Sequence, residues 1–267
     1  MRIATWNINS IRARVDRAVS WLERSQVDVL ALQETKCADA QFPEEPFREA
    51  GYAVAHTGNG QWNGVAIVSR LGLADVQVGF DGQPGFHKDP EAEAAPEPRA
   101  IAATCGGVRV WSLYVPNGRD LADRHYEYKL DWLAALKDQA AGWLASDADA
   151  KIALAGDWNI APFDEDVWDL SFFAGKTHIS PPEREAFFAF EQAGFADVAR
   201  PYTPGPGLYT YWDYTQLRFP RREGMRIDFV LGSPALAATV TGASVDREER
   251  KGKGASDHAP VVVELGD

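Results

Sequence analysis

Carboxylate and amide side chains follow several short apolar segments of the sequence. Asn7, Glu34 and Asp157 each come at or just after the end of such a segment, and Asn159 lies two residues beyond Asp157. Asp257 precedes the last apolar segment. Loops that leave rigid strands commonly carry functional groups. Oxygen ligands of this kind, with few thiolates or histidines among them, suit a hard cation such as Mg²⁺ or Mn²⁺ better than zinc.

This set of residues predicts metal-assisted phosphoryl chemistry. Mg²⁺ takes one or two carboxylates, keeps several waters and binds phosphate oxygens of a substrate. Glu34, with Asn7 or Asp257, fits that description. A bound cation stabilises charge on the phosphoryl group and orients an attacking water. A histidine beside an aspartate can carry a positive charge or move a proton, and Asp228 is a candidate to orient His258 in this way.

Each of these positions also has a purely structural interpretation. An acid or amide at a strand end often caps a turn, and a single histidine is commonly a hydrogen-bonded core residue. A glycoside hydrolase would need two carboxylates that flank a sugar, and the sequence favours an oxygen-rich cation site over that arrangement. The indication of catalysis comes from the set as a whole.

Apolar runs rich in Val, Ile and Leu predict the strands that must position these side chains. We expect strands over Arg2–Asn7, Asp28–Gln33, Tyr52–His56, Gly64–Ser69, Ala100–Cys105, Val108–Val115, Lys151–Gly156, Met225–Gly232 and Val261–Leu265. Apolar residues at helical spacing and helix start and stop signals predict helices over Ile11–Ser25, Arg124–Leu144 and Pro181–Ala193. Strands interspersed with helices indicate a layered α/β or α+β fold.

Composition narrows the class of protein. The chain has 267 residues, of which 45% are hydrophobic, so it can bury a full core, which excludes a disordered or fibrous class. No change of composition suggests a linker, and we expect a single domain over residues 1–267. Cys37 and Cys105 cannot form a disulfide scaffold, which indicates a reducing compartment. Without a membrane-spanning apolar run or a signal-peptide pattern, the sequence predicts a cytoplasmic protein with no membrane partner.

The charged residues are unevenly distributed. A net charge of −12 argues against a surface that binds nucleic acid everywhere. Acidic residues concentrate in Asp89–Pro98, which its prolines and charges mark as a solvated loop. Basic residues gather between residues 218 and 226 and again between residues 247 and 253. A local cationic groove is therefore compatible with the sequence, and a solvated face is the alternative explanation of each basic cluster.

Several short motifs occur in a characteristic order along the chain. They are Asn7, Leu32-Gln33-Glu34-Thr35-Lys36, Tyr114-Val115-Pro116-Asn117-Gly118, Gly156-Asp157-Trp158-Asn159, Arg226-Ile227-Asp228 and Ser256-Asp257-His258. In this order they resemble the exodeoxyribonuclease III and apurinic/apyrimidinic endonuclease family of the endonuclease/exonuclease/phosphatase superfamily. The resemblance runs from Arg2 to about Leu265. It implies a four-layered α/β sandwich, in which two mixed β-sheets pack face to face with helices outside and the active site lies at one edge.

The resemblance also implies roles for individual residues. Glu34 matches the principal metal ligand, with Asn7 and Asp257 as direct or water-mediated partners. Asp157 matches a residue that activates the attacking water or handles the leaving-group proton. Asn159 matches a residue that positions the phosphate or that water.

A second part of the matched site would contact the phosphate itself. By the same resemblance, His258, oriented by Asp228, contacts the non-bridging oxygens, and Tyr114 reaches the scissile phosphate or the departing oxygen. The resemblance leaves open whether one or two metal ions bind. It also leaves open how Asp157, His258 and Tyr114 divide the proton transfers.

Three features favour DNA as the substrate within a superfamily that also cleaves inositol phosphates and sphingomyelin. Arg119 can bond a backbone phosphate, a contact that positions a duplex without reading its sequence. The first basic cluster lies close in sequence to the proposed site. The resemblance implies that a pocket for a flipped abasic sugar is walled by Tyr211, Trp212, Met225 and Ile227, and core packing is the alternative explanation of the aromatic residues.

We therefore predict a Mg²⁺-dependent DNA-repair phosphodiesterase, with Mn²⁺ as an alternative ion. The enzyme would act on double-stranded DNA as a monomer, cutting 5′ to abasic sites and removing nucleotides or blocking groups from 3′ ends. One alternative is a phosphodiesterase or phosphatase of the same fold that acts on RNA, nucleotides or inositol phosphates. The other is a catalytically silent module that binds DNA or a partner.

Overall fold

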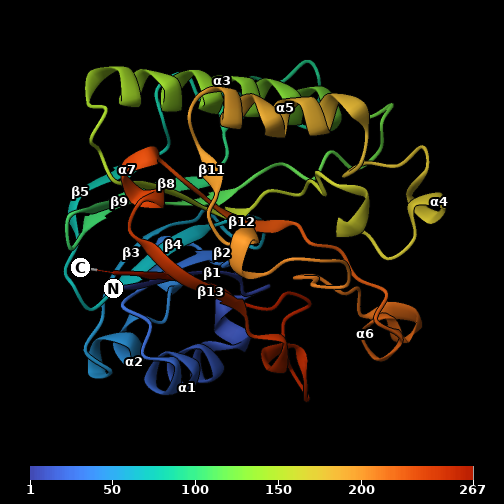
Figure 1. Cartoon of the computed structure of the whole chain (residues 1–267). Helices are drawn as coiled ribbons and strands as arrows, with labels where there is room; N and C mark the ends of the chain where they lie inside the picture. Colours follow the sequence, from blue (N-terminus) through green and yellow to red (C-terminus); the bar gives the residue numbers. More distant parts are fainter. Residues whose placement is uncertain (267) are drawn as a thin grey trace.

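Two six-stranded β-sheets form the centre of the computed structural model, which describes residues 1–266 (Figure 1). The first sheet contains β1 (Arg2–Asn7), β2 (Val29–Gln33), β3 (Ala53–Thr57), β4 (Val65–Ser69), β13 (Val240–Val245) and β14 (Val261–Leu265). The second contains β5 (Ala74–Val78), β8 (Ala100–Cys105), β9 (Val108–Tyr114), β10 (Ile152–Asp157), β11 (Ala196–Asp197) and β12 (Asp228–Gly232). The strand orders are β13-β14-β1-β2-β4-β3 and β11-β12-β10-β9-β8-β5.

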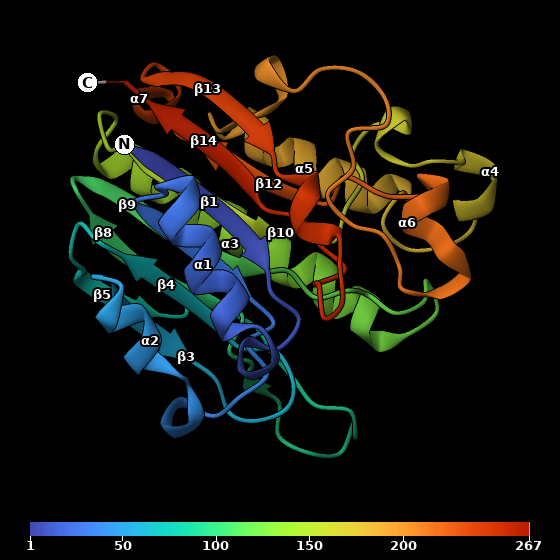
Figure 2. The same cartoon turned by 90° about the horizontal axis from the view of Figure 1, so that it is seen from below.

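Helices cover the outer face of each sheet. The helices α1 (Val15–Ser25) and α2 (Glu44–Glu49) lie on the first sheet, and α3 (Arg124–Ser146) and α5 (Pro181–Gln192) lie on the second (Figure 1 and Figure 2). Short helices are α4 (Leu170–Phe173), α6 (Arg218–Arg221) and α7 (Pro234–Ala237). Single 3₁₀ turns occur at Ile11–Ala13, Asp39–Gln41, Asp164–Asp166, Arg200–Tyr202, Thr215–Leu217 and Arg247–Arg250. These layers confirm the predicted four-layered α/β sandwich.

Apolar clusters hold the layers together. The cluster between the two sheets is built mainly from aliphatic residues such as Ile3, Ile67 and Ala155. Larger aromatic residues, including Trp132 and Phe187, fill the space between the second sheet and its helices. Strands that are buried on both faces need apolar residues at consecutive positions, which explains the continuous apolar runs of β2, β4 and β10. Among the helices of residues 1–266, none combines the length and the apolar character that crossing a membrane requires.

Strand pairing brings the chemically active residues to one end of the sheets. β1 and β2 are parallel, so Asn7 reaches the same edge as the end of β2, where Glu34 follows. β10 lies between β9 and β12, and Asp157 pairs with Tyr114 on one side and with Asp228 on the other. The two sheets therefore present oxygen-bearing side chains to each other across one edge of the sandwich.

The predicted strand Met225–Gly232 differs from the observed one. Regular pairing begins only at Asp228. Met225 instead makes isolated bridges to Val167 and Tyr211, which lie outside the sheet. The residues before Asp228 pair with loop segments and not with a strand, so they are not part of the sheet. These residues are therefore free to line a cavity.

Other expected elements also need correction. The expected helix Ile11–Ser25 is interrupted at Arg14, whose φ of −138° is not helical, so a 3₁₀ turn precedes α1. Within the expected loop Asp89–Pro98, Ala95–Pro96 (β7) pairs with Gly85–Phe86 (β6) in a small ribbon. The edge strands β5 and β13 were not expected, because partly exposed strands carry polar residues and lack a continuous apolar run.

Candidate active site

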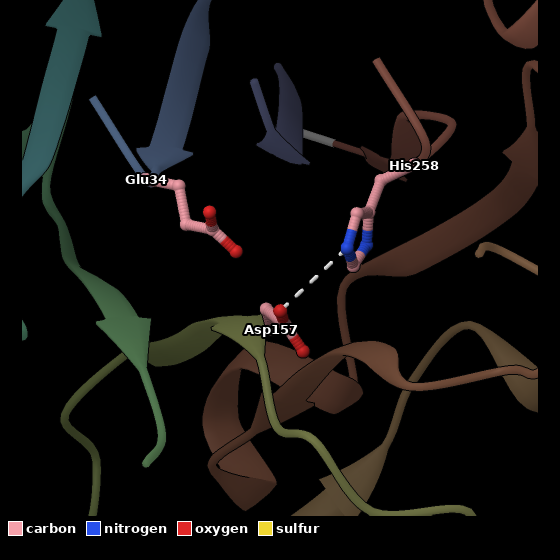
Figure 3. A group of neighbouring side chains, drawn as sticks. All are labelled: Glu34, Asp157 and His258. Carbon is pink, nitrogen blue, oxygen red and sulfur yellow. Dashed lines mark ion pairs between the residues drawn. The ribbon is translucent and has the colours of Figure 1, made fainter. Parts of the chain in front are cut away.

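Three side chains from distant parts of the sequence converge at the edge of the sandwich. Glu34, Asp157 and His258 each offer a ligand atom, and these atoms lie within 4.8 Å of one another. Figure 3 shows the side chains pointing toward a common centre, with Glu34 coming from the end of β2, Asp157 from β10 and His258 from the loop before β14.

Asn7 joins the carboxylates of the two sheets. Its side chain is fully buried, and its Nδ2 donates to Glu34 Oε1 at 2.9 Å and to Asp157 Oδ2 at 3.0 Å. One amide therefore uses both of its hydrogens to hold two acids side by side. This arrangement depends on sheet packing, because Asn7 and Asp157 are 150 residues apart in sequence.

Glu34 lies in a strained turn and faces a positive charge. Its φ of 52° is a left-handed conformation that is disfavoured for a residue with a side chain. The Ser10 N–H donates to the Glu34 carbonyl at 2.7 Å and holds this turn in place. Burial alone would raise the pKa of Glu34, but Lys36, whose Nζ is 2.6 Å from Oε2, and the bond from Asn7 lower the pKa below its ordinary value. The Glu34 carboxylate is therefore ionised and able to bind a cation.

His258 lies between two buried aspartates. Its Nδ1 is 2.8 Å from Asp228 Oδ2, and its Nε2 is 3.8 Å from Asp157 Oδ2. Burial would lower the pKa of His258, but the charges of Asp228 and Asp157 raise it to about 10, so the ring is an imidazolium. Asp157 has a pKa raised to about 7 by burial and by the nearby charges of Asp228 and Glu34, against the opposite effects of His258 and Asn7.

A small cavity opens over these residues. It measures about 170 Å³ and is lined by Glu34, Tyr114, Asn117, Asp157, Asn159, His178, Tyr211, Met225, Ile227, Asp257 and His258. Most of the expected site residues therefore meet here. Asn7 and Asp228 lie behind this lining and contact it through Glu34 and His258.

Tyr114 and Asn159 contribute polar groups to the wall of the cavity. Burial and the neighbouring Glu34 raise the pKa of Tyr114 well above its ordinary value, so its phenol remains a hydrogen-bond donor. Asn159 Nδ2 donates to the Val115 carbonyl at 2.9 Å, which leaves the second hydrogen of this amide for another acceptor. Asn117 Nδ2 lies 3.2 Å from Asn159 Oδ1 and fixes the orientation of the amide.

His178 is a wall residue that the sequence analysis missed. Its Nε2 lies 3.2 Å from Asn159 Oδ1, and its φ of 80° is left-handed. Burial and the charge of Lys129 lower the pKa of His178 to about 4, so the ring is neutral. No local signal identifies it, because it lies in an irregular loop before α5 and belongs to none of the motifs.

Trp212 does not line the cavity, which corrects the expectation for this residue. Its side chain is 1% exposed and packs with Tyr209 and Ala259 in a separate apolar cluster. Neighbouring residues in an extended segment point to opposite sides. Because Tyr211 faces His258, with 4.9 Å between the ring centroids, Trp212 must face the interior.

Arg119 and Asp257 lie further from the centre than the cluster of ligand atoms. Arg119 is exposed and lines a different cavity of about 630 Å³, together with Trp62 and His125. Asp257 lines the catalytic cavity, and its Oδ1 accepts a hydrogen bond from Asn9 Nδ2 at 3.0 Å. Asp257 is not among the residues whose ligand atoms lie within 4.8 Å of one another.

The donor atoms fit a hard divalent cation. Two carboxylates that lie this close repel each other, and a cation between them would relieve that repulsion. Nδ1 of His258 is engaged with Asp228, and the raised pKa of the ring favours its charged form, so the carboxylate and amide oxygens are the better donors for a cation. Oxygen donors in this number match ions such as Mg²⁺ and Mn²⁺.

Comparisons with known proteins agree with this geometry. Residues 4–258 match the model of the Endonuclease/Exonuclease/phosphatase family. The exodeoxyribonuclease of Bacillus subtilis is 30% identical over 267 residues, which cover 98% of each chain. The structure of the 3′ phosphatase NExo from Neisseria, bound to a product DNA hairpin, is similar with a TM-score of 0.92 and 37% identity over all of both chains. An AP endonuclease from Archaeoglobus fulgidus is similar with a TM-score of 0.90 and 33% identity over 99% of each chain. The chain therefore belongs to the endonuclease/exonuclease/phosphatase family.

Proposed function

We propose that this protein is a DNA-repair phosphodiesterase that cuts duplex DNA 5′ to abasic sites and removes nucleotides or blocking groups from 3′ ends. The observation that carries the proposal is the convergence of Glu34, Asp157 and an Asp228-backed imidazolium, His258, on one small cavity. The names of the similar proteins, an exodeoxyribonuclease, a 3′ phosphatase and an AP endonuclease, support DNA as the substrate.

A divalent cation, which we take to be Mg²⁺ with Mn²⁺ as the alternative, would complete the site. Glu34 would be its principal ligand, with Asn7, Asp157 and Asp257 close by as direct or water-mediated partners. When bound, such an ion supplies electrostatic stabilisation of charge on the phosphoryl oxygens.

The protein's own residues divide the remaining work of hydrolysis. Asp157 is placed to orient a water molecule for attack on phosphorus and to accept its proton. The His258 imidazolium donates to a non-bridging oxygen, and Asp228 keeps that ring charged and correctly turned. The P–O3′ bond breaks, and the departing 3′ oxygen needs a proton donor, a role for which the Tyr114 phenol is suitably placed. Asn159 contributes its free N–H to the phosphate or to the attacking water.

The size and the walls of the cavity favour an abasic sugar over an intact nucleotide. A volume of about 170 Å³ is below the range of roughly 300–1,000 Å³ that is typical of ligand pockets. Tyr211, Met225 and Ile227 supply the apolar part of the wall. An apolar wall of this kind suits a deoxyribose that lacks its base.

The test is incubation of the purified chain with an end-labelled duplex that contains one abasic site. With Mg²⁺ we expect incision 5′ to that site, and with EDTA we expect none. The same preparation is assayed for phosphate release from RNA, nucleotides and inositol phosphates. Turnover of those compounds with an intact abasic duplex would favour the alternative substrate class and refute a DNA-repair role.

We further propose that residues 1–267 form one domain that acts as a monomer in the cytoplasm. The pairing of β1 with β14 in one sheet supports a single domain. Both cysteines, Cys37 and Cys105, are free and buried, which supports a reducing compartment. Sedimentation analysis of the chain with and without duplex DNA tests the oligomeric state.

A further inference from the structure

A second, aromatic cavity adjoins the catalytic one. It measures about 260 Å³, and its lining residues are Trp168, Phe172, Phe173, Tyr211, Asp213, Thr215, Gln216, Arg218, Glu223, Gly224 and Met225. Tyr211 and Met225 also line the catalytic cavity, so the two spaces share a wall. None of the roles given above to the site residues uses this second cavity as a binding site.

Two projecting segments form the sides of the aromatic cavity. One segment is α4 with the preceding Trp168, and the other is the 3₁₀ turn Thr215–Leu217 with α6. Both segments extend from the same side of the sandwich (Figure 1 and Figure 2). A ligand in this cavity would therefore lie beside the catalytic residues and remain open to solvent.

The walls combine aromatic rings with one cation, Arg218, and two acids, Asp213 and Glu223. The rings of Trp168 and Phe172 have centroids 5.1 Å apart. The guanidinium of Arg218 lies 5.0 Å from the first centroid and 4.7 Å from the second. Lys176, which is exposed and does not line the cavity, places its ammonium 3.5 Å from the centroid of Phe172. Arg218 is held by an ion pair with Glu223 and by Gln216 Oε1 at 2.7 Å, so this cation is fixed in position.

These surroundings suit a nucleobase that carries a phosphate. Flat heterocycles stack on aromatic side chains without regard to base identity. The exposed Lys176 beside Phe172 can attract a phosphate next to such a base, whereas the charge of Arg218 is paired with Glu223. The amide of Gln216 and the hydroxyl of Thr215 offer hydrogen-bonding groups for the edge of a base.

We propose that the aromatic cavity binds the base of the 3′-terminal nucleotide of a DNA strand while the phosphate of that nucleotide lies in the catalytic cavity. The proposal rests on the proposed function, because the shared wall of Tyr211 and Met225 matters only if the reaction occurs in the neighbouring cavity. A paired base must break its base pair and its stacking to enter the cavity. A mismatched base leaves the duplex at a lower cost in free energy. The cavity therefore favours removal of unpaired 3′-terminal nucleotides.

Phe172 is the residue with which to test this site. Its side chain is 38% exposed, so its replacement leaves the core intact. Phe163 is a second exposed phenylalanine, 37% exposed, that contacts Phe188 and Arg200 and is not among the residues of the aromatic cavity. Phe172→Ala removes one of the aromatic rings of the wall, Phe172→Trp keeps an aromatic ring at this position, and Phe163→Ala is the matched control.

Two DNA hairpins provide the probes. They are identical except at the 3′-terminal residue, which is an unpaired 2-aminopurine nucleotide in one and an abasic residue in the other. The Kd of each hairpin is measured in EDTA with the full chain, so that nothing is cleaved, and the fluorescence of 2-aminopurine reports stacking of the terminal base.

Phe172→Ala is expected to raise the Kd of the base-bearing hairpin about 10-fold, which corresponds to about 1.4 kcal/mol. The Kd of the abasic-ended hairpin should not change. Quenching of 2-aminopurine on binding should be lost in Phe172→Ala and retained in Phe172→Trp and Phe163→Ala. Equal changes for both hairpins, or no change for either, would overturn the proposal. If the wild-type chain hydrolyses no DNA with Mg²⁺, the proposed function fails, and the binding comparison still decides whether the cavity takes a base.

Discussion

The charge on His258 is set by buried aspartates and not by solvent. Nδ1 contacts Asp228, and Nε2 faces Asp157, so two negative charges offset the cost of burying an imidazolium. A positive charge held this way is already oriented when negative charge develops on a phosphate, which is the main advantage of a preorganised site. Asp157 lines the catalytic cavity and Asp228 does not, so Asp157 is the acid that remains available to water.

Asp157→Asn tests this division of labour. The amide keeps the shape of the side chain but cannot accept a proton from water, so we expect incision of an abasic duplex to slow by about 10²–10⁴-fold. The Kd of abasic DNA should remain measurable and close to that of the wild type. Single-turnover rates and binding curves check both expectations, with Asp149→Asn in an exposed turn as the control. Full activity in Asp157→Asn would refute the assigned role.

Glu34 is the residue to alter when testing the cation. It is ionised beside Lys36 and bonded to Asn7, so it is prepared to bind a divalent ion. Glu34→Ala should raise the Mg²⁺ concentration needed for half-maximal rate by about 10-fold or more. Glu34→Gln, which removes the charge but keeps the shape, should behave similarly. A metal titration that is unchanged in both variants would remove Glu34 from the set of ligands.

Helices α3 and α5 hold the active-site loops through one buried ion pair. Lys129 of α3 and Glu183 of α5 are both fully buried and paired. Lys129 Nζ also donates to the carbonyls of Asn159 at 2.7 Å and Asn117 at 3.3 Å. Glu183 Oε1 accepts from the N–H of His178 at 2.9 Å. The two helices thus fix the backbone of three residues that line the catalytic cavity.

Lys129→Met tests the contribution of this pair. Removing one partner leaves Glu183 charged and buried, so we expect the free energy of unfolding to fall by about 3–5 kcal/mol. Denaturant unfolding curves measure the change. Lys137→Met, at a more exposed position of the same helix whose Lys pairs with Asp138, should alter stability by less than about 1 kcal/mol. A similarly small change in the free energy of unfolding in both variants would show that the Lys129–Glu183 pair does not stabilise the fold.

At the scale of the whole molecule, two histidines destabilise the folded state at acidic pH. Burial and nearby cations lower the pKa of His125 and of His178 to about 4. For His125 these cations are Arg99 and Arg119, and its Nδ1 accepts the N–H of Gly118 at 3.1 Å. The unfolded chain takes up protons at these histidines near pH 6.5, whereas the folded chain does so only near pH 4.

The stability that these two histidines contribute should therefore fall as the pH decreases from about 6.5 to 4, whereas Asp157, with its pKa raised to about 7, acts in the opposite direction. We expect each histidine to contribute about 1–3 kcal/mol of this loss. His125→Asn keeps an acceptor for Gly118 but does not titrate, so its unfolding free energy should depend less steeply on pH in this interval. Chemical denaturation at several pH values provides the measurement. Identical slopes for the variant and the wild type would contradict the expected role of His125.

Much of the central sheet structure follows from local sequence. Strands such as Val65–Ser69 and Ile152–Asp157 are buried on both faces, and that requirement appears directly as a continuous apolar run. The order of the short motifs also determined the family, because it depends on residue types and not on contacts. The same local patterns could not predict β5 and β13, since edge strands are partly exposed and carry mixed residues.

The detailed site was decided by tertiary structure. Local sequence marked both Tyr211 and Trp212, and only the path of the chain turns Tyr211 toward His258 and buries Trp212. His178 and the aromatic cavity between α4 and α6 have no sequence signal, because loops that belong to no regular element create them. Asn7 could be recognised as polar at a strand end, but its bond to Asp157 exists only because two sheets pack together. Burial periodicity is a local property of the chain, whereas a catalytic site is made of long-range distances that folding alone brings about.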